Sequence, residues 1–258
     1  MKPDQTDINI TVADYVATIE VQRPPHNFID QHLLSAIVDA YEGFDKDPGC
    51  RAIVLCSAGK NFCAGANYDP NESKEEATLS LDDFFQHAER LFRCQTPVIA
   101  AIQGAAVGGG LGLAVSADFR VTCPEGRFHA NFTRLGFNPG FGLPVTLPRL
   151  IGAQRANLMF LTSRRIKGEQ AYAWGLADDL VPLEQLRGAA LALAGEIAAN
   201  APLATRATRL AIRRGLAEEI ERYNAEDLSA QHRLRETADW QEGITAVAER
   251  RNPVFKGR

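Results

Sequence analysis

The sequence has little excess charge of either sign and no long apolar run. Its 258 residues include 28 Lys and Arg against 32 Asp and Glu, a net charge of −4. This weak acidic balance disfavours nucleic-acid binding, because neutralising phosphates needs a basic surface. No apolar stretch approaches the ~18 residues of a membrane span, and residues 2–14 are too polar for a signal peptide. We therefore expect a cytoplasmic protein that binds neither nucleic acid nor membranes.

Cysteine and histidine are also scarce. The five cysteines form no CxxC pair and are odd in number, which predicts buried, reduced thiols. They are Cys50, Cys56, Cys63, Cys94 and Cys123. The five histidines are scattered, with none at an i, i+4 spacing, so we expect no metal site.

What the sequence does contain is a regular alternation of strand and helix patterns, followed by helices. Strands are predicted at residues 8–12, 16–21, 52–55, 97–102 and 118–122, and helices after Asp30, at 81–93 and after the triple glycine. This alternation predicts an α/β fold with parallel pairing. Beyond Pro139 the patterns are mostly helical, at 154–162, 167–174, 184–199, 202–215, 218–236 and 239–250. We place a domain boundary near residue 200, with a core over 1–200 and a helical oligomerisation region over 201–258.

Two glycine-bearing bends stand out, each following an apolar run. They are Cys63-Ala64-Gly65-Ala66-Asn67 and Gly108-Gly109-Gly110-Leu111-Gly112. A strand that turns into a helix at glycine leaves the first helical N–H groups without partners, and the helix dipole favours an anion there. Two converging N–H groups could stabilise an enolate or a tetrahedral oxyanion. A close-packed strand–helix turn is the alternative interpretation of each bend. The second bend is not a dinucleotide fingerprint, because the final glycine is absent.

Several further motifs accompany these bends along the chain. They include Val21-Gln22-Arg23-Pro24, Asn61-Phe62-Cys63-Ala64-Gly65-Ala66, residues 96–104, Leu135-Gly136-Phe137-Asn138-Pro139-Gly140, Ala171-Tyr172-Ala173-Trp174-Gly175-Leu176 and Arg251-Asn252-Pro253-Val254-Phe255-Lys256. With them the chain resembles the enoyl-CoA hydratase/isomerase (crotonase) family over nearly its whole length.

The resemblance implies a fold, a ligand and a site. The fold is a spiral of ββα units closed by C-terminal helices, assembled as trimers or dimers of trimers. The substrate is an acyl-CoA thioester, with coenzyme A as part of the substrate and no separate cofactor. Ala66 and Gly109 would supply the two N–H donors for the thioester oxygen. The residues implied in substrate and CoA binding are Ala64, Gly65, Gly108, Phe132, Asn138, Phe255 and Lys256.

The chain departs from the hydratase pattern at both catalytic positions. By the resemblance, Gly112 and Phe132 stand where hydratases carry two glutamates, and neither can transfer a proton. His129 is a candidate general base because its pKa range suits neutral pH; the alternative is a histidine satisfied by the core. Cys63 is a candidate nucleophile or a small buried thiol.

We therefore expect oxyanion chemistry other than glutamate-driven hydration: hydrolysis or C–C cleavage, decarboxylation, or isomerisation. A hydratase that takes its base from Asp69 or Glu72 is the first alternative. The second is a CoA-binding scaffold without turnover.

Overall fold

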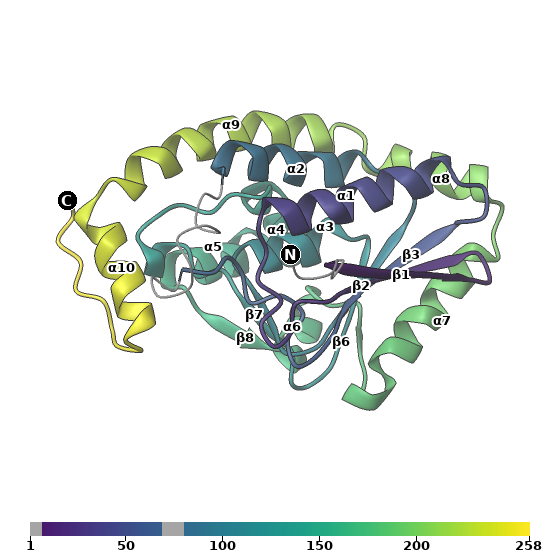
Figure 1. Ribbon diagram of the computed structural model, residues 1–258, viewed down its shortest axis with the longest axis horizontal. Helices are drawn as coiled ribbons and strands as arrows, with labels where there is room; N and C mark the ends of the chain where they lie inside the picture. Colours follow the sequence, from purple (N-terminus) through teal and green to yellow (C-terminus); the bar gives the residue numbers. More distant parts are fainter. Residues whose placement is uncertain (1–6, 69–79) are drawn as a thin grey trace, which may run out of the picture.

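The computed structural model describes residues 7–68 and 80–258, which form a six-stranded and a three-stranded sheet (Figure 1). The larger sheet has the order β1-β2-β3-β4-β6-β9. Its strands are β1 (Ile8–Ala13), β2 (Val16–Val21), β3 (Ala52–Ser57), β4 (Val98–Ile102), β6 (Phe119–Thr122) and β9 (Asp179–Leu180). β1 pairs antiparallel with β2, and all other neighbours in this sheet are parallel. The α/β class with parallel pairing is confirmed.

The parallel strands are buried on both faces, and successive residues serve different cores. In β3, Ile53 and Leu55 pack with the residues of α1 (Gln31–Lys46) and α2 (Leu81–Arg93). Val54 points the other way and packs beneath α7 (Leu186–Ala198). Two buried faces explain why this strand is a continuous apolar run rather than an alternating one. Figure 1 shows α1, α2 and α9 together on one side of the sheet and α7 on the other.

Apart from α4 (Leu143–Ile151), which was not predicted, the remaining helices lie close to the predicted ranges. They are α3 (Gly109–Ser116), α5 (Ala153–Thr162), α6 (Gly168–Trp174), α8 (Pro202–Ile212), α9 (Leu216–Arg235) and α10 (Ala238–Ala248), with short 3-10 turns η1 (Thr133–Leu135) and η2 (Leu183–Gln185). Asp30 caps α1 as predicted, because its Oδ1 accepts from the Leu33 N–H at 2.8 Å.

The three-stranded sheet was not predicted. It consists of β5 (Ala105–Val107), β7 (Arg127–His129) and β8 (Arg165–Lys167), in that order. Each strand has three residues, which is too short for a period-2 pattern to be recognised in the sequence. These strands exist because of their partners, which lie more than twenty residues away along the chain.

Helix α8 has its polar face toward the protein and its apolar face toward the solvent. Its arginines point inward: Arg206 donates to the carbonyl oxygens of Asp45 and Phe44 at 2.6 and 3.1 Å, and Arg209 is buried. Its large apolar residues point outward, with Leu203 81% exposed and Ile212 78% exposed. The predicted boundary falls between α7 and α8, and the division into two domains stays a prediction.

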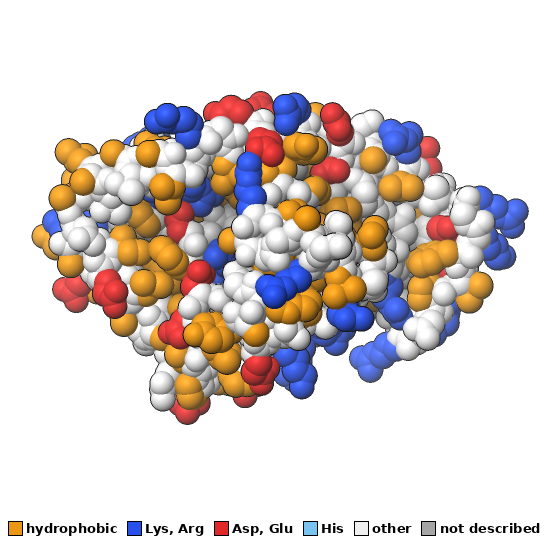
Figure 2. All heavy atoms as spheres, turned by 180° about the vertical axis from the view of Figure 1, so that it is seen from behind, with side chains coloured by type: hydrophobic (Ala, Val, Ile, Leu, Met, Phe, Trp, Pro, Cys, Tyr) orange, Lys and Arg blue, Asp and Glu red, His pale blue; other side chains and the backbone are white. Residues whose placement is uncertain are grey.

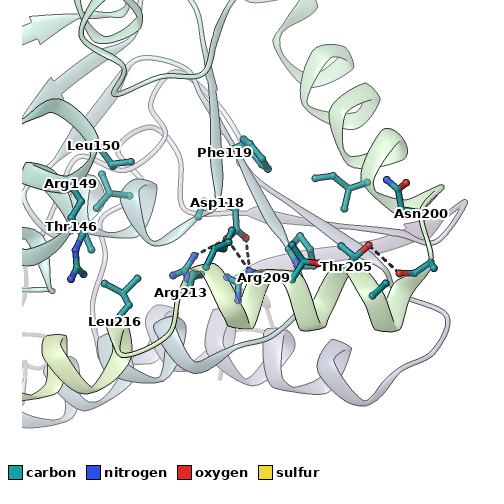
Figure 3. Close-up of a pocket in the computed structure, with 18 residues that line it drawn as sticks. Asp118, Phe119, Thr146, Arg149, Leu150, Asn200, Thr205, Arg209, Arg213 and Leu216 are labelled. Atoms are coloured by element: carbon teal, nitrogen blue, oxygen red, sulfur yellow. Dashed lines mark hydrogen bonds and ion pairs between the residues drawn. The ribbon is translucent and has the colours of Figure 1, made fainter.

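A cavity of about 770 Å³ lies beside α8, at the amino ends of β4 and β6 (Figure 3). Side chains of Phe119, Leu150 and Leu216 line it, and the ion pairs between Asp118, Arg209 and Arg213 lie against α8. Asp118 accepts from Arg209 Nε at 2.8 Å and from Arg213 Nη1 at 2.8 Å. One buried carboxylate therefore ties α8 to the start of β6.

The face shown in Figure 2 carries acidic and basic side chains interspersed with apolar ones. Among the helices within residues 7–68 and 80–258, none has both the length and the apolar character needed to cross a bilayer.

The Asp118 cluster generates a stability prediction. Burial alone would raise the pKa of Asp118, but the Arg209 and Arg213 guanidinium groups outweigh it and hold the pKa below its ordinary value of 3.8. Asp118→Asn leaves the buried Arg209 and the half-buried Arg213 without their counter-charge, so we expect a loss of about 3–5 kcal/mol at pH 7. Because the pKa is lowered on folding, this contribution is present above the ordinary pKa and is lost as pH falls through the folded-state pKa.

Urea unfolding of both proteins from pH 7 to pH 3 measures this difference. The matched control is Asp39→Asn, which removes the exposed partner of Arg90 and should cost no more than ~1 kcal/mol. Equal effects of the two substitutions at pH 7 would contradict the prediction.

Candidate active site

The two glycine-bearing bends lie side by side because one short parallel bridge joins them. Cys63 pairs with Ala106: the Cys63 N–H donates to the Ala105 oxygen at 2.8 Å, and the Val107 N–H donates to the Cys63 oxygen at 3.0 Å. Ala66 and Gly109 each lie three residues beyond this pair. Parallel segments in register advance together, so the two residues emerge next to each other at the same edge.

Glycine is required at two places in the second bend. Gly108 has φ +54° and ψ −117°, which a side chain would strain, and its N–H donates to the His129 oxygen at 2.9 Å. A Cβ on Gly110 would lie 2.3 Å from the Cys63 carbonyl oxygen. The close approach of the two bends therefore depends on the absence of a side chain at residue 110.

The N–H groups of Ala66 and Gly109 have no hydrogen-bond acceptor among the residues that the structure describes. Gly109 is the first residue of α3, so its N–H belongs to the positive end of the helix dipole. Both donors are available to a ligand.

Both residues line one cavity of about 60 Å³. The cavity contains six of the predicted site residues: Ala64, Gly65, Ala66, Gly108, Gly109 and Phe132. Apolar side chains from α2 and the 135–141 segment cover most of the rest, including Phe84, Phe137 and Phe141. Of the described residues that line this cavity, none carries a carboxylate.

The space beside Gly112 is filled by an aromatic ring. A Cβ on Gly112 would lie 2.5 Å from the Phe141 ring, which itself packs edge-on against Phe84 with the centroids 5.5 Å apart. A longer side chain at residue 112 therefore requires Phe141 to move. Phe132 packs edge-on against Phe137.

The His129 side chain does not line the cavity. It is 8% exposed, and its Nε2 lies 2.9 Å from the Ser163 carbonyl oxygen. Burial lowers the pKa of His129 to about 4, against the opposing effect of the Ser163 hydrogen bond. The imidazole is thus neutral at pH 7, and its Nε2 is engaged by Ser163. Its main chain does contribute to the site, because its carbonyl oxygen holds the Gly108 N–H.

The structure gives no support to Cys63 as a nucleophile and does not describe the candidate acids Asp69 and Glu72. Burial raises the pKa of the Cys63 thiol to about 12, so it is protonated at neutral pH. All five cysteines are buried and unpaired. Asp69 and Glu72 lie outside the described residues. Within residues 7–68 and 80–258, no group of three His, Cys, Asp or Glu side chains could hold a metal ion.

The other three residues implied in substrate and CoA binding, Asn138, Phe255 and Lys256, do not line this cavity. Asn138 and Phe255 line a second cavity of about 510 Å³, and Phe137 lines both cavities. Lys256 follows Phe255, and its backbone N–H donates to Asp239 Oδ1 at 2.6 Å. The structure therefore places Asn138 and Phe255 next to the first cavity rather than in it.

Sequence reasoning missed two polar residues of the first cavity, Gln231 and Arg235 on α9. Gln231 Nε2 donates to the Asn138 carbonyl oxygen at 2.9 Å, and Arg235 Nη2 donates to the Tyr68 hydroxyl at 3.4 Å. The sequence around them is a charged helix without a distinguishing motif. Only the packing of α9 brings these residues to the bends.

Comparison with known proteins identifies the family of this chain. The family model described as enoyl-CoA hydratase/isomerase matches residues 11–258. The chain therefore belongs to the enoyl-CoA hydratase/isomerase (crotonase) family, and its fold is the crotonase-like α/β fold, as expected from the resemblance.

Relatives cover the chain almost completely. The short-chain-enoyl-CoA hydratase of Clostridium acetobutylicum is 33% identical over 94% of this chain and 95% of its own length. The carnitinyl-CoA dehydratase of Proteus mirabilis is 32% identical over 97% of this chain and 98% of its own. The crystal structure of an enoyl-CoA hydratase/isomerase from Pseudoalteromonas atlantica superposes with a TM-score of 0.87, at 27% identity, covering 97% of this chain and 100% of the other.

The contact between Gly112 and Phe141 can be tested by a double-mutant cycle. Replacing a helical glycine by alanine normally stabilises a helix by about 1 kcal/mol. At residue 112 the new methyl group overlaps the Phe141 ring, so we expect Gly112→Ala to destabilise the protein by about 1–3 kcal/mol. In a Phe141→Ala background the same substitution should be neutral or stabilising. Urea unfolding of the four proteins measures this coupling, and an equal cost in both backgrounds would contradict it.

Proposed function

We propose that this chain is an acyl-CoA-processing enzyme that binds a CoA thioester and stabilises its enolate or oxyanion with the N–H groups of Ala66 and Gly109. The observation that carries the proposal is the Cys63–Ala106 bridge, from which both donors extend by the same number of residues into one cavity. Two main-chain donors fixed by a β-bridge need no reorganisation when charge develops on the oxygen. Each such donor is worth about 3 kcal/mol of transition-state stabilisation in comparable sites.

The reaction we propose is hydrolysis or C–C cleavage, decarboxylation, or isomerisation, without the two hydratase glutamates. Two observations support this part. The described lining of the cavity carries no carboxylate, and the Phe141 ring occupies the space beside Gly112. Reactions in which bond cleavage itself generates the enolate need the least proton transfer, so they suit such a wall best. His129 as the general base stays a prediction, and its contact with Ser163 gives that role no support.

Hydration is the second candidate. The relatives named above are a hydratase and a dehydratase. Hydration by this chain needs a base from another position, because neither Gly112 nor Phe132 can accept a proton. Asp69 and Glu72 are the residues we would test for that role. An assay of crotonyl-CoA hydration separates this candidate from the first. Hydration is measured as the loss of the enoyl absorbance.

Self-association as a trimer or a dimer of trimers belongs to the same proposal. Its support is the outward apolar face of α8 and the 770 Å³ cavity beside it, which Ile212 also lines. Exposed apolar surface of this kind is typical of a protein–protein interface.

The interface is tested by sedimentation velocity. We expect the wild-type protein to sediment as a trimer or hexamer. Leu203→Glu combined with Ile212→Glu places two charges on the apolar face and should shift the protein to monomer. Leu161→Glu, at a residue of α5 that is 76% exposed, is the matched control and should leave the mass unchanged. A monomeric wild-type protein would contradict this part of the proposal.

The oxyanion donors are tested by exchange of the α-proton of a saturated acyl-CoA in D₂O. Gly109→Pro removes one donor at the first helical position, where proline is tolerated. We expect exchange to fall by about 10²–10³-fold. Gly109→Ala is the control, because it adds the same Cβ next to Phe84 and Ile29 but keeps the N–H. Mass spectrometry of the recovered thioester measures exchange.

Three outcomes decide the matter. A large loss with proline and a small one with alanine supports the proposal. Equal losses in the two variants would contradict a role of the Gly109 N–H. Tight CoA binding without exchange of any thioester in the wild-type protein would instead favour a scaffold without turnover.

A further inference from the structure

Arg235 presents a cation to the cavity that the N–H groups of Ala66 and Gly109 also reach. It is the last residue of α9 and lines the cavity together with Ala66 and Gly109. Its Nη2 makes a long hydrogen bond of 3.4 Å to the Tyr68 hydroxyl. Its Nε is buried and has no hydrogen-bond partner among the described residues. A guanidinium has five N–H donors, so most of its capacity is unused.

Several other inward-facing arginines are paired with carboxylates, and Arg206 is held by main-chain carbonyl oxygens instead. Arg120 pairs with Asp178, Arg209 and Arg213 share Asp118, and Arg23 is held between Asp7 and Asp30. For Arg235, no carboxylate lies within ion-pair distance in the described parts of the chain. A partly buried cation without a counter-charge is costly unless a ligand supplies the charge.

Aromatic rings hold the guanidinium in place. Its central carbon lies 5.3 Å from the Phe137 ring centroid and 5.0 Å from that of Trp240. Tyr68 packs edge-on against Trp240, with the centroids 5.4 Å apart. Ring faces attract the flat surface of the guanidinium and leave its edge of N–H groups for a planar anion. The side chain is therefore ordered before a ligand arrives, which lowers the entropic cost of binding.

We propose that the acyl group taken by this site carries a carboxylate of its own, and that Arg235 binds it. This rests on the proposed function, because it places the thioester oxygen at Ala66 and Gly109. Arginine and carboxylate form bidentate pairs with two parallel hydrogen bonds. A neutral acyl chain has no group that could accept from the Arg235 guanidinium in this way. The substrate class is a dicarboxylic acyl group joined to CoA through one end. The phosphates of CoA are the other anions available, and the test separates the two sources.

The test compares thioesters that differ only in the distal carboxylate. Glutaryl-CoA is paired with pentanoyl-CoA, and malonyl-CoA with propionyl-CoA, so the CoA phosphates are the same within each pair. Isothermal calorimetry gives the affinities. We expect the wild-type protein to bind one dicarboxylic thioester roughly 10-fold or more tightly than its neutral counterpart, the size of one charge-assisted hydrogen bond. Arg235→Gln should remove that preference and leave the neutral thioester's affinity within about 2-fold, because only the carboxylate contact is lost.

Two further variants keep the test sharp. Arg233→Gln, on the same helix but exposed and bonded to Ser229, should keep the full preference. Arg235→Lys keeps the positive charge and should retain part of the preference for the dicarboxylic thioester. A merely structural Arg235 would move the melting temperature and weaken all four thioesters alike.

Each result has one meaning. A wild-type protein that binds both members of each pair equally overturns the inference while leaving the proposed function intact. A preference that survives in Arg235→Gln also overturns it. An equal loss for charged and neutral thioesters overturns it too, and indicates phosphate binding if the melting temperature is unchanged and a structural role if the melting temperature falls. Failure of all four thioesters to bind the wild-type protein would refute the proposed function itself.

Discussion

One pair of hydrogen bonds organises the site of this protein. The bridge between Cys63 and Ala106 brings together two segments that are separated by some forty residues, and it sets them in parallel register. From that pair, each segment runs three residues further to a main-chain N–H that has no acceptor within residues 7–68 and 80–258. Gly110 permits the contact, because any side chain there would meet the Cys63 carbonyl oxygen. The geometry of the donors is therefore a property of the backbone and does not depend on a rotamer.

The described wall of this cavity is unusual in what it offers a ligand. Main-chain donors, a guanidinium and amide side chains face an otherwise largely apolar surface, and none of the described residues that line it carries a carboxylate. Such a wall stabilises negative charge and has little capacity to remove protons. This combination favours reactions in which the substrate generates its own anion, and it explains why family membership by itself does not decide the reaction.

Inward-facing arginines have different partners in the C-terminal helices α8 and α9. In α8, arginines face inward and tie the helix to Asp118 and to the carbonyl oxygens at the end of α1, which leaves the apolar residues outside. In α9, Arg235 reaches the cavity and is held by aromatic rings instead of a carboxylate. Inward-facing arginine thus stabilises one helix and supplies a site residue from the other.

The α/β class, most of the strands and helices and the two bends could be predicted from the sequence, because periodicity, caps and glycine spacing are local signals. The family was predicted separately, from motifs along the chain that resemble it. The sequence did not predict the three-residue strands β5, β7 and β8, whose pairing comes from distant partners. Nor did it place His129, whose side chain turns toward Ser163, or bring Gln231 and Arg235 to the cavity. Only the tertiary structure decided these points, since the direction of a side chain and the meeting of distant elements depend on how helices pack over the sheet.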